Sequence, residues 1–258
     1  ADKLNDYVIM GELSLDGTLQ PVKGALSMAI SARKEGFKGI ILPVQNAPEA
    51  AVIDGIEVYG ARNIREVVDL LNQAPGHISV MGRSSASFEP ATTHIYSDFA
   101  DVKGQTAVKR ALEVAASGGH NLIMIGPPGS GKSMMARALP SILPPLTEEE
   151  SIETTRIHSV AGFTGHGTAL ISERPFRHPH HTITNVALTG GGSNGQPGEI
   201  SLAHNGILYL DELPEFTRSA LEVLRQPLED RTVVISRAKY RVEYPASFML
   251  VASMNPCP

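Results

Sequence analysis

Eight residues near the middle of the chain have the types and spacing that bind phosphate. They read Gly-Pro-Pro-Gly-Ser-Gly-Lys-Ser over Gly126–Ser133 and fit the Walker A pattern G-x-x-x-x-G-K-[ST] at every fixed position. The glycines let several backbone N–H groups point at one phosphate, and the following helix adds a positive dipole end. We expect Lys132 to reach the β- and γ-phosphates of a nucleotide and Ser133 to ligate Mg²⁺. Nucleotide contacts are expected at Gly126, Pro127, Pro128, Gly129, Ser130, Gly131, Lys132, Ser133 and Met134.

The residues on either side of this loop have the patterns of a strand and a helix. Asn121–Ile125 is a short apolar run, and Met134–Leu139 is typical of the first turns of a helix. A phosphate-binding loop requires this strand–loop–helix context. The alternative is a glycine-rich turn without nucleotide, but the pattern arises by chance in only about one chain in a hundred of this size.

Two adjacent carboxylates follow a second apolar run, Gly206–Leu210. A buried parallel strand has such a run, and ligands bind at the carboxyl ends of parallel strands. Asp211 is expected to hold Mg²⁺, and Glu212 to polarise the attacking water as a general base. The alternative role for these acids is to cap the next helix. Together with the glycine-rich loop, they predict a site for ATP and Mg²⁺.

A third apolar run, Ala246–Met254, ends at the polar residue Asn255. If this strand lies beside the strand of the phosphate-binding loop, Asn255 is close to the γ-phosphate or the attacking water. The alternative is an asparagine in the turn before Pro256, which this residue type favours. As the third member of the series, Asn255 is predicted to be the sensor residue of the site.

Length and composition predict a cytoplasmic enzyme that works without a membrane partner. The chain has 258 residues, of which 42% are hydrophobic, and this allows one and a half to two domains. Its single cysteine, Cys257, excludes an internal disulfide. No apolar run approaches membrane-spanning length, and no signal peptide is visible. The net charge of −5 requires any nucleic-acid surface to be local. Because the chain begins at Ala1 and stops soon after Asn255, we expect a fragment of a longer protein.

The patterns divide the chain into three stretches, 1–72, 73–97 and 98–258. The first alternates short strands with helices, the second is a linker rich in Pro, Gly and Ser, and the third contains the phosphate-binding loop. The elements expected before that loop are a strand over Tyr7–Leu15 with a turn at Asp16–Gly17, a helix over Ala25–Lys34, a strand over Gly39–Pro43, and helices over Ile64–Leu71 and Gln105–Gly118.

Longer motifs run through residues 98–258. They are Asp101–Gln105, Gly118–Asn121, Gly126–Ser133, Arg174–Thr182, Pro197–His204, Leu210–Phe216, Arg225–Asp230 and Met254–Pro258. With these motifs the stretch resembles the AAA+ ATPases of the magnesium-chelatase-like group, and in particular the YifB/ComM proteins. Magnesium chelatase proper and the MCM helicases share the layout but lack the Arg-Pro-Phe-Arg-x-Pro-His-His-Thr string.

The resemblance implies an α/β fold, a P-loop AAA+ parallel sheet flanked by helices with hairpin inserts. It implies a homo-hexameric ring and, for ComM-like members, ATP-driven helicase or branch-migration activity on single-stranded or branched DNA in natural transformation or recombination. In such rings the arginine finger, the last core strand and the helical lid lie beyond the sensor strand. The chain is therefore expected to be an AAA+ core truncated after the sensor, with inefficient turnover by itself.

Residues 1–72 resemble the C-terminal half of a Lon-protease-like α+β domain. Met10–Gly17, Pro21–Val22 and Gly36–Pro43 carry the resemblance. The catalytic lysine that follows the Pro-Val element in a Lon peptidase is replaced here by Leu26, with Lys23 three residues out of register. This implies a proteolytically inactive, structural or oligomerisation domain.

Two inserts bear on the substrate. Thr232–Pro245 has apolar alternation around a short basic centre, which predicts a hairpin with Arg237 and Lys239 near its tip. Such charges grip phosphates without reading sequence, whereas the alternative is a solvated tip. The similarly placed hairpin of MCM helicases points into the ring pore, so the resemblance favours DNA.

Ser159–Thr184 carries three histidines in four positions, but nearby Asp, Glu and Cys are lacking, so a nucleic-acid or subunit contact is favoured over a metal site.

The function predicted from the sequence is an ATP-hydrolysing AAA+ ring motor that moves on DNA. The main alternative is a magnesium-chelatase-type or protein-remodelling ATPase, whose ring acts on another protein. A nucleotide-gated assembly module without turnover is the third possibility.

Overall fold

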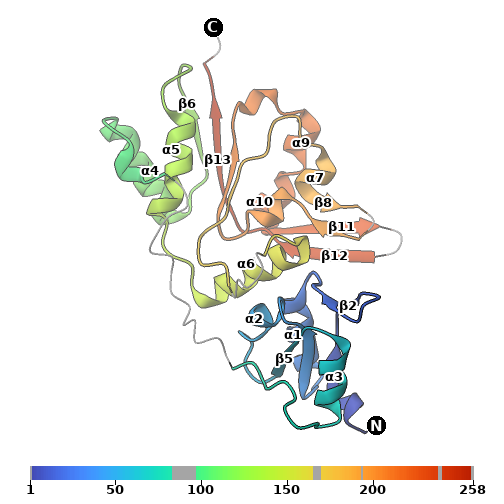
Figure 1. Ribbon diagram of the computed structural model, residues 1–258. Coiled ribbons are helices and arrows are strands. Elements are labelled where there is room, and N and C mark those ends of the chain that lie inside the picture. Colours follow the sequence, from blue (N-terminus) through green and yellow to red (C-terminus); the bar gives the residue numbers. More distant parts are fainter. Residues whose placement is uncertain (1, 83–96, 165–169, 193, 238–239, 257–258) are drawn as a thin grey trace. The chain divides into compact units, whose positions relative to one another are not determined.

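The computed structural model describes residues 2–82, 97–164, 170–192, 194–237 and 240–256 (Figure 1). The chain divides into two compact units, Ala1–Glu89 with Thr155–Ile171, and Pro90–Thr154 with Ser172–Pro258. The segment Thr155–Ile171 was expected within the ATPase region, but it belongs to the first unit. No helix of the described residues is long and apolar enough to cross a membrane.

The first unit is built on a parallel sheet of order β1-β4-β5, formed by Tyr7–Ile9, Gly39–Pro43 and Glu57–Ala61. The central strand β4 is buried at all five positions, as its continuous apolar run requires. Alternate residues of the sheet pack against two groups of helices. These helices are α1 (Ala25–Lys34) and α2 (Ala47–Ala50) in one core cluster, and α3 (Ile64–Leu71) in the other.

The strand expected over Tyr7–Leu15 is divided in two. It follows the short helix η1 (Asp2–Asp6), and β1 ends at Ile9, after which Met10 N–H donates to Ile41 O. The chain then forms β2 (Glu12–Leu13), which pairs antiparallel with β3 (Leu19–Gln20) through the predicted turn. Because β2 pairs with its own hairpin partner, it does not extend the sheet of β1.

The second unit contains a four-stranded parallel sheet of order β6-β13-β10-β7. The strands are β6 (Leu122–Ile125), β13 (Met249–Met254), β10 (Ile207–Leu210) and β7 (Phe176–Arg177). Figure 1 shows β13, from the end of the chain, beside β6 from its middle. The three apolar runs that precede the predicted site residues are therefore adjacent strands, and their carboxyl ends share one edge.

Helices cover both faces of this sheet, since alternate residues of the buried strand β10 point in opposite directions. Ile207 and Tyr209 pack in the core cluster of α4 (Thr106–Gly118), α5 (Lys132–Ala138) and the short η2 (Phe99–Asp101) and η3 (Leu139–Ile142). Leu208 and Leu210 pack in the cluster of α7 (Asn185–Thr189), α8 (Glu199–Leu202) and α9 (Arg218–Glu222). The predicted class, an α/β parallel sheet flanked by helices, is confirmed. The remaining helices are α6 (Glu148–Ala161), η4 (Leu213–Glu215) and α10 (Arg225–Asp230).

Two hairpins are inserted into this unit. The predicted hairpin is β11 (Thr232–Arg237) with β12 (Tyr240–Pro245), paired from Thr232↔Pro245 to Arg237↔Tyr240. A second, shorter one joins β8 (Gly190–Gly191) to β9 (Gln196–Pro197). The Tyr240 hydroxyl donates to Gly192 O at 2.6 Å and the Tyr244 hydroxyl to Gly195 O at 2.8 Å, which ties the two hairpins together. Lys239 and the Arg237 side chain lie outside the part of the chain that the structure describes.

Candidate functional site

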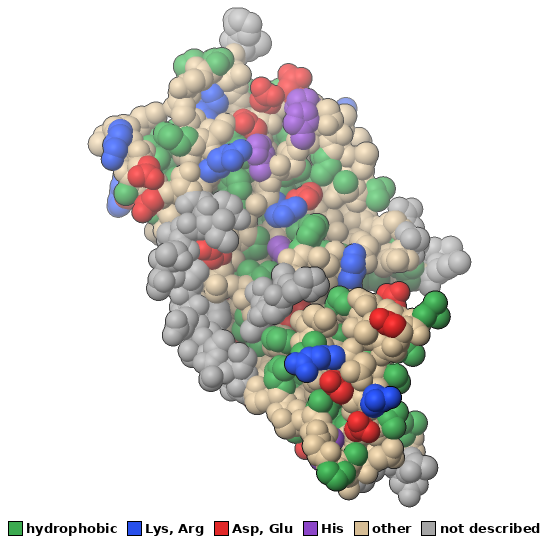
Figure 2. Space-filling model, in the orientation of Figure 1, with side chains coloured by type: hydrophobic (Ala, Val, Ile, Leu, Met, Phe, Trp, Pro, Cys, Tyr) green, Lys and Arg blue, Asp and Glu red, His purple; other side chains and the backbone are tan. Residues whose placement is uncertain are grey.

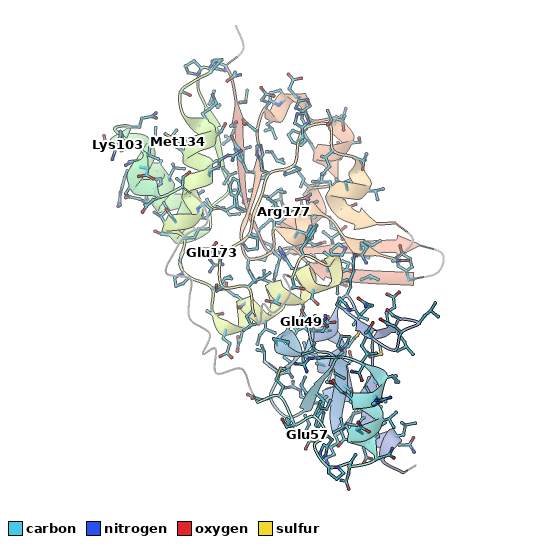
Figure 3. The ribbon with its side chains drawn as sticks, viewed as in Figure 1. Glu49, Glu57, Lys103, Met134, Glu173 and Arg177 are labelled. Carbon is cyan, nitrogen blue, oxygen red and sulfur yellow. The ribbon has the colours of Figure 1, made fainter. Side chains whose placement is uncertain are left out.

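The glycine-rich loop connects β6 to α5, as its pattern predicts. Gly129 and Gly131 have φ angles of 76° and 84°, which L side chains rarely adopt, so glycine is needed at both positions. Gly131 is the residue before α5, and the helix begins at Lys132. Met134 lies in its first turn and is partly exposed (Figure 3). The loop therefore places the N–H groups of a helix start beside the ends of the parallel strands.

The Lys132 ammonium group lies inside the curl of this loop. It donates to Gly126 O at 2.6 Å, to Pro127 O at 2.9 Å and to Ser130 Oγ at 3.4 Å. It also donates to Asn255 Oδ1 at 3.0 Å. Since Asn255 directly follows β13, which pairs with β6, the strand order brings the predicted sensor residue to the predicted phosphate-binding lysine.

Asp211 and Ser133 meet across the same edge. The Ser133 hydroxyl donates to Asp211 Oδ2 at 2.9 Å, and the Ser253 hydroxyl donates to Asp211 Oδ1. The Glu212 N–H also donates to Oδ1, at 3.1 Å. Burial alone raises the pKa of Asp211, but the hydrogen bonds from Ser253, Ser133 and the Glu212 backbone outweigh it and hold the pKa below its ordinary value. The carboxylate is therefore ionised at neutral pH.

Glu212 stands at the start of the short helix η4, and its side chain is 58% exposed. Its backbone has a φ of 54°, a left-handed conformation that is unusual for a residue other than glycine. His181 Nδ1 lies 3.8 Å from Glu212 Oε2. The acid is therefore open to solvent.

Two histidines, His178 and His181, lie near the carboxyl end of β10, and sequence reasoning did not place them there. The His178 ring lies 4.8 Å from the Tyr209 ring, and the His180 and His181 rings are 4.1 Å apart. Burial lowers the pKa of His178. They reach the site because Phe176–Arg177 pairs in parallel with Ile207–Leu208, so the residues after β7 arrive at the edge where Asp211 lies. Because β7 has only two residues, its sequence has no alternating pattern from which the strand could be predicted.

Within the described residues, no group of three or more His, Cys, Asp or Glu side chains could hold a metal ion. Acidic and histidine side chains lie near one another on the visible face of the second unit (Figure 2).

The two arginines of the histidine-containing insert make ion pairs in the fold. Arg177, labelled in Figure 3, binds both carboxylate oxygens of Glu199 at 2.6 and 2.7 Å. Arg174 pairs with Glu150 at 3.0 Å and donates to the backbone oxygens of Pro144 and Asn205. These part-buried ion pairs hold β7 against its neighbours, so both arginines have a structural role.

The donor set at the edge of the sheet suits a nucleotide with Mg²⁺. The hydroxyl of Ser133 and the carboxylate of Asp211 are hard oxygen ligands within 2.9 Å of each other, and Mg²⁺ is bound in proteins by one or two such groups together with substrate phosphates. Lys132 and the N–H groups at the start of α5 supply the positive charge that phosphates need.

Residues 98–258 match the family model of magnesium chelatase, subunit ChlI, and residues 1–46 match that of subunit ChlI of Mg-chelatase. YifB of Salmonella typhimurium is 43% identical over the whole chain, and the competence protein ComM of Haemophilus influenzae is 42% identical. The chain spans about half the length of each (50%). A cryo-EM-based structure of the BchI–BchD complex of magnesium chelatase aligns with 58% of the chain and 52% of its own, at 23% identity and a TM-score of 0.46.

Proposed function

The chain belongs to the magnesium-chelatase-like AAA+ family together with YifB and ComM, and from this premise we propose that it is the ATP-hydrolysing core of a ring motor. The motor acts on DNA in the cytoplasm as a ComM-like helicase or branch-migration factor, in natural transformation or recombination. Single-stranded or branched DNA passes through the pore of a homo-hexamer.

The meeting of Lys132, Asn255, Ser133 and Asp211 at one sheet edge carries the ATPase part of this proposal. Lys132 holds the β- and γ-phosphates, together with the N–H groups of the loop. Ser133 and Asp211 hold Mg²⁺, which when bound neutralises charge on the phosphates. Glu212 takes the proton of the attacking water, and Asn255 orients that water or the γ-phosphate.

Two substitutions separate nucleotide binding from hydrolysis. Lys132→Ala is expected to abolish ATP binding, because it removes the positive charge inside the loop. Glu212→Gln is expected to keep ATP bound but to lower its hydrolysis at least 100-fold, because the Mg²⁺ ligands remain while the base is lost. Binding of a fluorescent ATP analogue and steady-state phosphate release, both on the full-length protein, measure the two effects. A Glu212→Gln protein that hydrolyses ATP at the wild-type rate would show that Glu212 is not the base.

The DNA part of the proposal rests on the β11–β12 hairpin and on the relationship to ComM, whose name links that relative to competence. The sequence predicts two positive charges, Arg237 and Lys239, near the tip of this hairpin in a chain with a net charge of −5. Such charges bind phosphates of any sequence. The first test is the ATPase rate of the full-length protein without DNA and with single-stranded, duplex or branched DNA. A rate that no DNA changes would contradict a DNA motor.

Replacing both Arg237 and Lys239 by Ala tests the hairpin. DNA binding should weaken similarly for all sequences, and its dependence on salt should become shallower by about two units of slope at most. Basal ATPase should remain. The matched control replaces Lys38 and Arg62 by Ala, which removes the same charges from exposed pairs with Glu57 and Glu66 in the first unit. If both double variants bind DNA like the wild type, the hairpin tip is only a solvated loop.

The match to magnesium chelatase supports the second candidate, a ring that remodels a partner protein. An ATPase rate that responds to a protein partner and to no form of DNA would favour it. Nucleotide binding without turnover in the full-length protein would favour the third candidate, an assembly module. Sedimentation with and without a non-hydrolysable ATP analogue tests the ring itself, and a monomer under both conditions contradicts it.

A further inference from the structure

A buried tyrosine hydroxyl lies behind the two groups assigned to Mg²⁺. Tyr209 is completely buried in β10, between the apolar residues Leu208 and Leu210. Its hydroxyl donates either to Ser133 Oγ, at 3.3 Å, or to Ser253 Oγ, at 3.2 Å. Burying a hydroxyl costs free energy unless it is hydrogen-bonded. The two serine neighbours therefore explain why a tyrosine is tolerated at this buried position.

The tyrosine ring is held independently of the glycine-rich loop. It stacks on Phe176 with a centroid distance of 5.9 Å and an interplanar angle of 29°, and the His178 ring lies 4.8 Å away. Phe176 and Tyr209 both belong to the sheet. The hydroxyl is therefore fixed by the rigid sheet, whereas Ser133 belongs to the helix that follows the loop.

The side chains of Tyr209, Ser133, Ser253 and Asp211 form one hydrogen-bonded network. Ser133 and Ser253 each give their only hydroxyl proton to Asp211, one to each carboxylate oxygen. Both serine oxygens can still accept, and Tyr209 has one proton to give to either.

We propose that Tyr209 and Ser253 are positioning residues of the Mg²⁺ site, an inference that rests on the function proposed above. Ser253 is completely buried on β13 and aims one oxygen of the Asp211 carboxylate. Tyr209 restrains the Ser133 oxygen from behind, so the hydroxyl does not sample its other rotamers. Because Mg²⁺ demands near-ideal octahedral geometry, fixing both ligands in advance favours its binding.

Tyr209→Phe removes the hydroxyl and keeps the ring contacts. The Mg²⁺ concentration that gives half-maximal binding of a fluorescent ATP analogue to the full-length protein should rise about tenfold. Binding of the same analogue in EDTA should stay within twofold of the wild type, because Lys132 and the loop are untouched. The matched control is Tyr244→Phe, which removes a hydroxyl that donates to Gly195 O, outside the network.

Ser253→Ala provides an independent test if Tyr209→Phe lowers the yield of folded protein. It should also raise the Mg²⁺ requirement, and the double variant should lose less than the product of the single effects, because the two residues share one network. A wild type that binds nucleotide with a Mg²⁺ requirement, together with variants of unchanged requirement, would overturn the positioning roles. A wild type that binds no nucleotide would instead overturn the proposed function.

Discussion

Two carboxylates have opposite surroundings: Asp211 in the second unit is partly exposed, whereas Glu49 in the first unit is buried. Asp211 accepts hydrogen bonds on both oxygens, and their sum lowers its pKa although burial acts to raise it. Glu49, labelled in Figure 3, is 4% exposed, and burial raises its pKa. Its Oε1 accepts bonds of 3.3 Å from Ser159 and 3.4 Å from Asn46, and among the described residues its buried Oε2 has no hydrogen-bond partner.

Burial and hydrogen-bond donors together set the charge state: Asp211 is only partly buried and has short bonds, whereas Glu49 is buried and its bonds from Ser159 and Asn46 are longer. Asp211 is stabilised as an anion and is open enough to meet a cation, which is what a metal ligand requires. Glu49 also accepts hydrogen bonds, but the cost of desolvation outweighs them and raises its pKa. A buried acid is therefore a candidate metal ligand only when hydrogen-bond donors compensate for the cost of burying its charge.

The largest expected effect comes from neutralising each carboxylate in turn. Asp211→Asn should lower Mg²⁺-dependent ATP hydrolysis at least 100-fold, since the charge is lost and the amide cannot accept from both Ser133 and Ser253. Glu49→Gln should leave it within twofold. Steady-state ATPase assays over a range of Mg²⁺ concentrations compare the two. Equal losses of ATPase activity in both variants would contradict the assignment of Asp211 as a metal ligand and Glu49 as a structural acid.

Removing one serine donor from each carboxylate should have a moderate effect on stability. Ser253→Ala removes a bond to an ionised group and should cost about 1.5–3 kcal/mol of unfolding free energy. Ser159→Ala removes a longer bond and should cost about 0.5–1 kcal/mol. Denaturant unfolding, followed for each unit's transition, measures both. A larger loss for Ser159→Ala would show that Glu49 depends more on its donors than the distances indicate.

The smallest expected effect is a pH dependence in the first unit. Because the pKa of Glu49 is raised in the folded state, the folded protein binds more protons than the unfolded chain, and stability falls as pH rises between the ordinary value of 4.5 and the raised one. Relative to Glu49→Gln, the wild type should become more stable as the pH falls from 7 to 4.5. Thermal unfolding of both proteins across this range provides the measurement. If the stability difference between the wild type and Glu49→Gln does not change with pH, the pKa of Glu49 is not raised in the folded protein.

Local patterns were enough to predict the parts of the site that follow one another along the chain. The loop, the three apolar runs and the polar residue after each are encoded in short windows, and the parallel sheet then brings Lys132, Asp211 and Asn255 to one edge. The hairpin over Thr232–Pro245 was also predicted, because alternation on both sides of a turn is a local signal.

What the sequence did not reveal depends on pairing between distant segments. His178 and His181 reach the site through a two-residue strand, Phe176–Arg177, that is defined by its partner β10 rather than by its own pattern. The expected strand over Tyr7–Leu15 is divided because β2 finds a closer partner in β3. The Tyr209 hydroxyl was hidden for a related reason, since a tyrosine in an apolar run reads as core until its neighbours are known.

The position of β13 between β6 and β10 has a consequence for how the protein is made. Strand β6 carries the glycine-rich loop, yet its hydrogen-bonded neighbour in the sheet is Met249–Met254, which leaves the ribosome much later. Until then β6 and β10 lack the strand that joins them, and two apolar edges await pairing. The nascent chain is therefore exposed to aggregation or chaperone binding for most of the synthesis between β6 and β13, and nucleotide can help to stabilise the fold only after β13 has emerged.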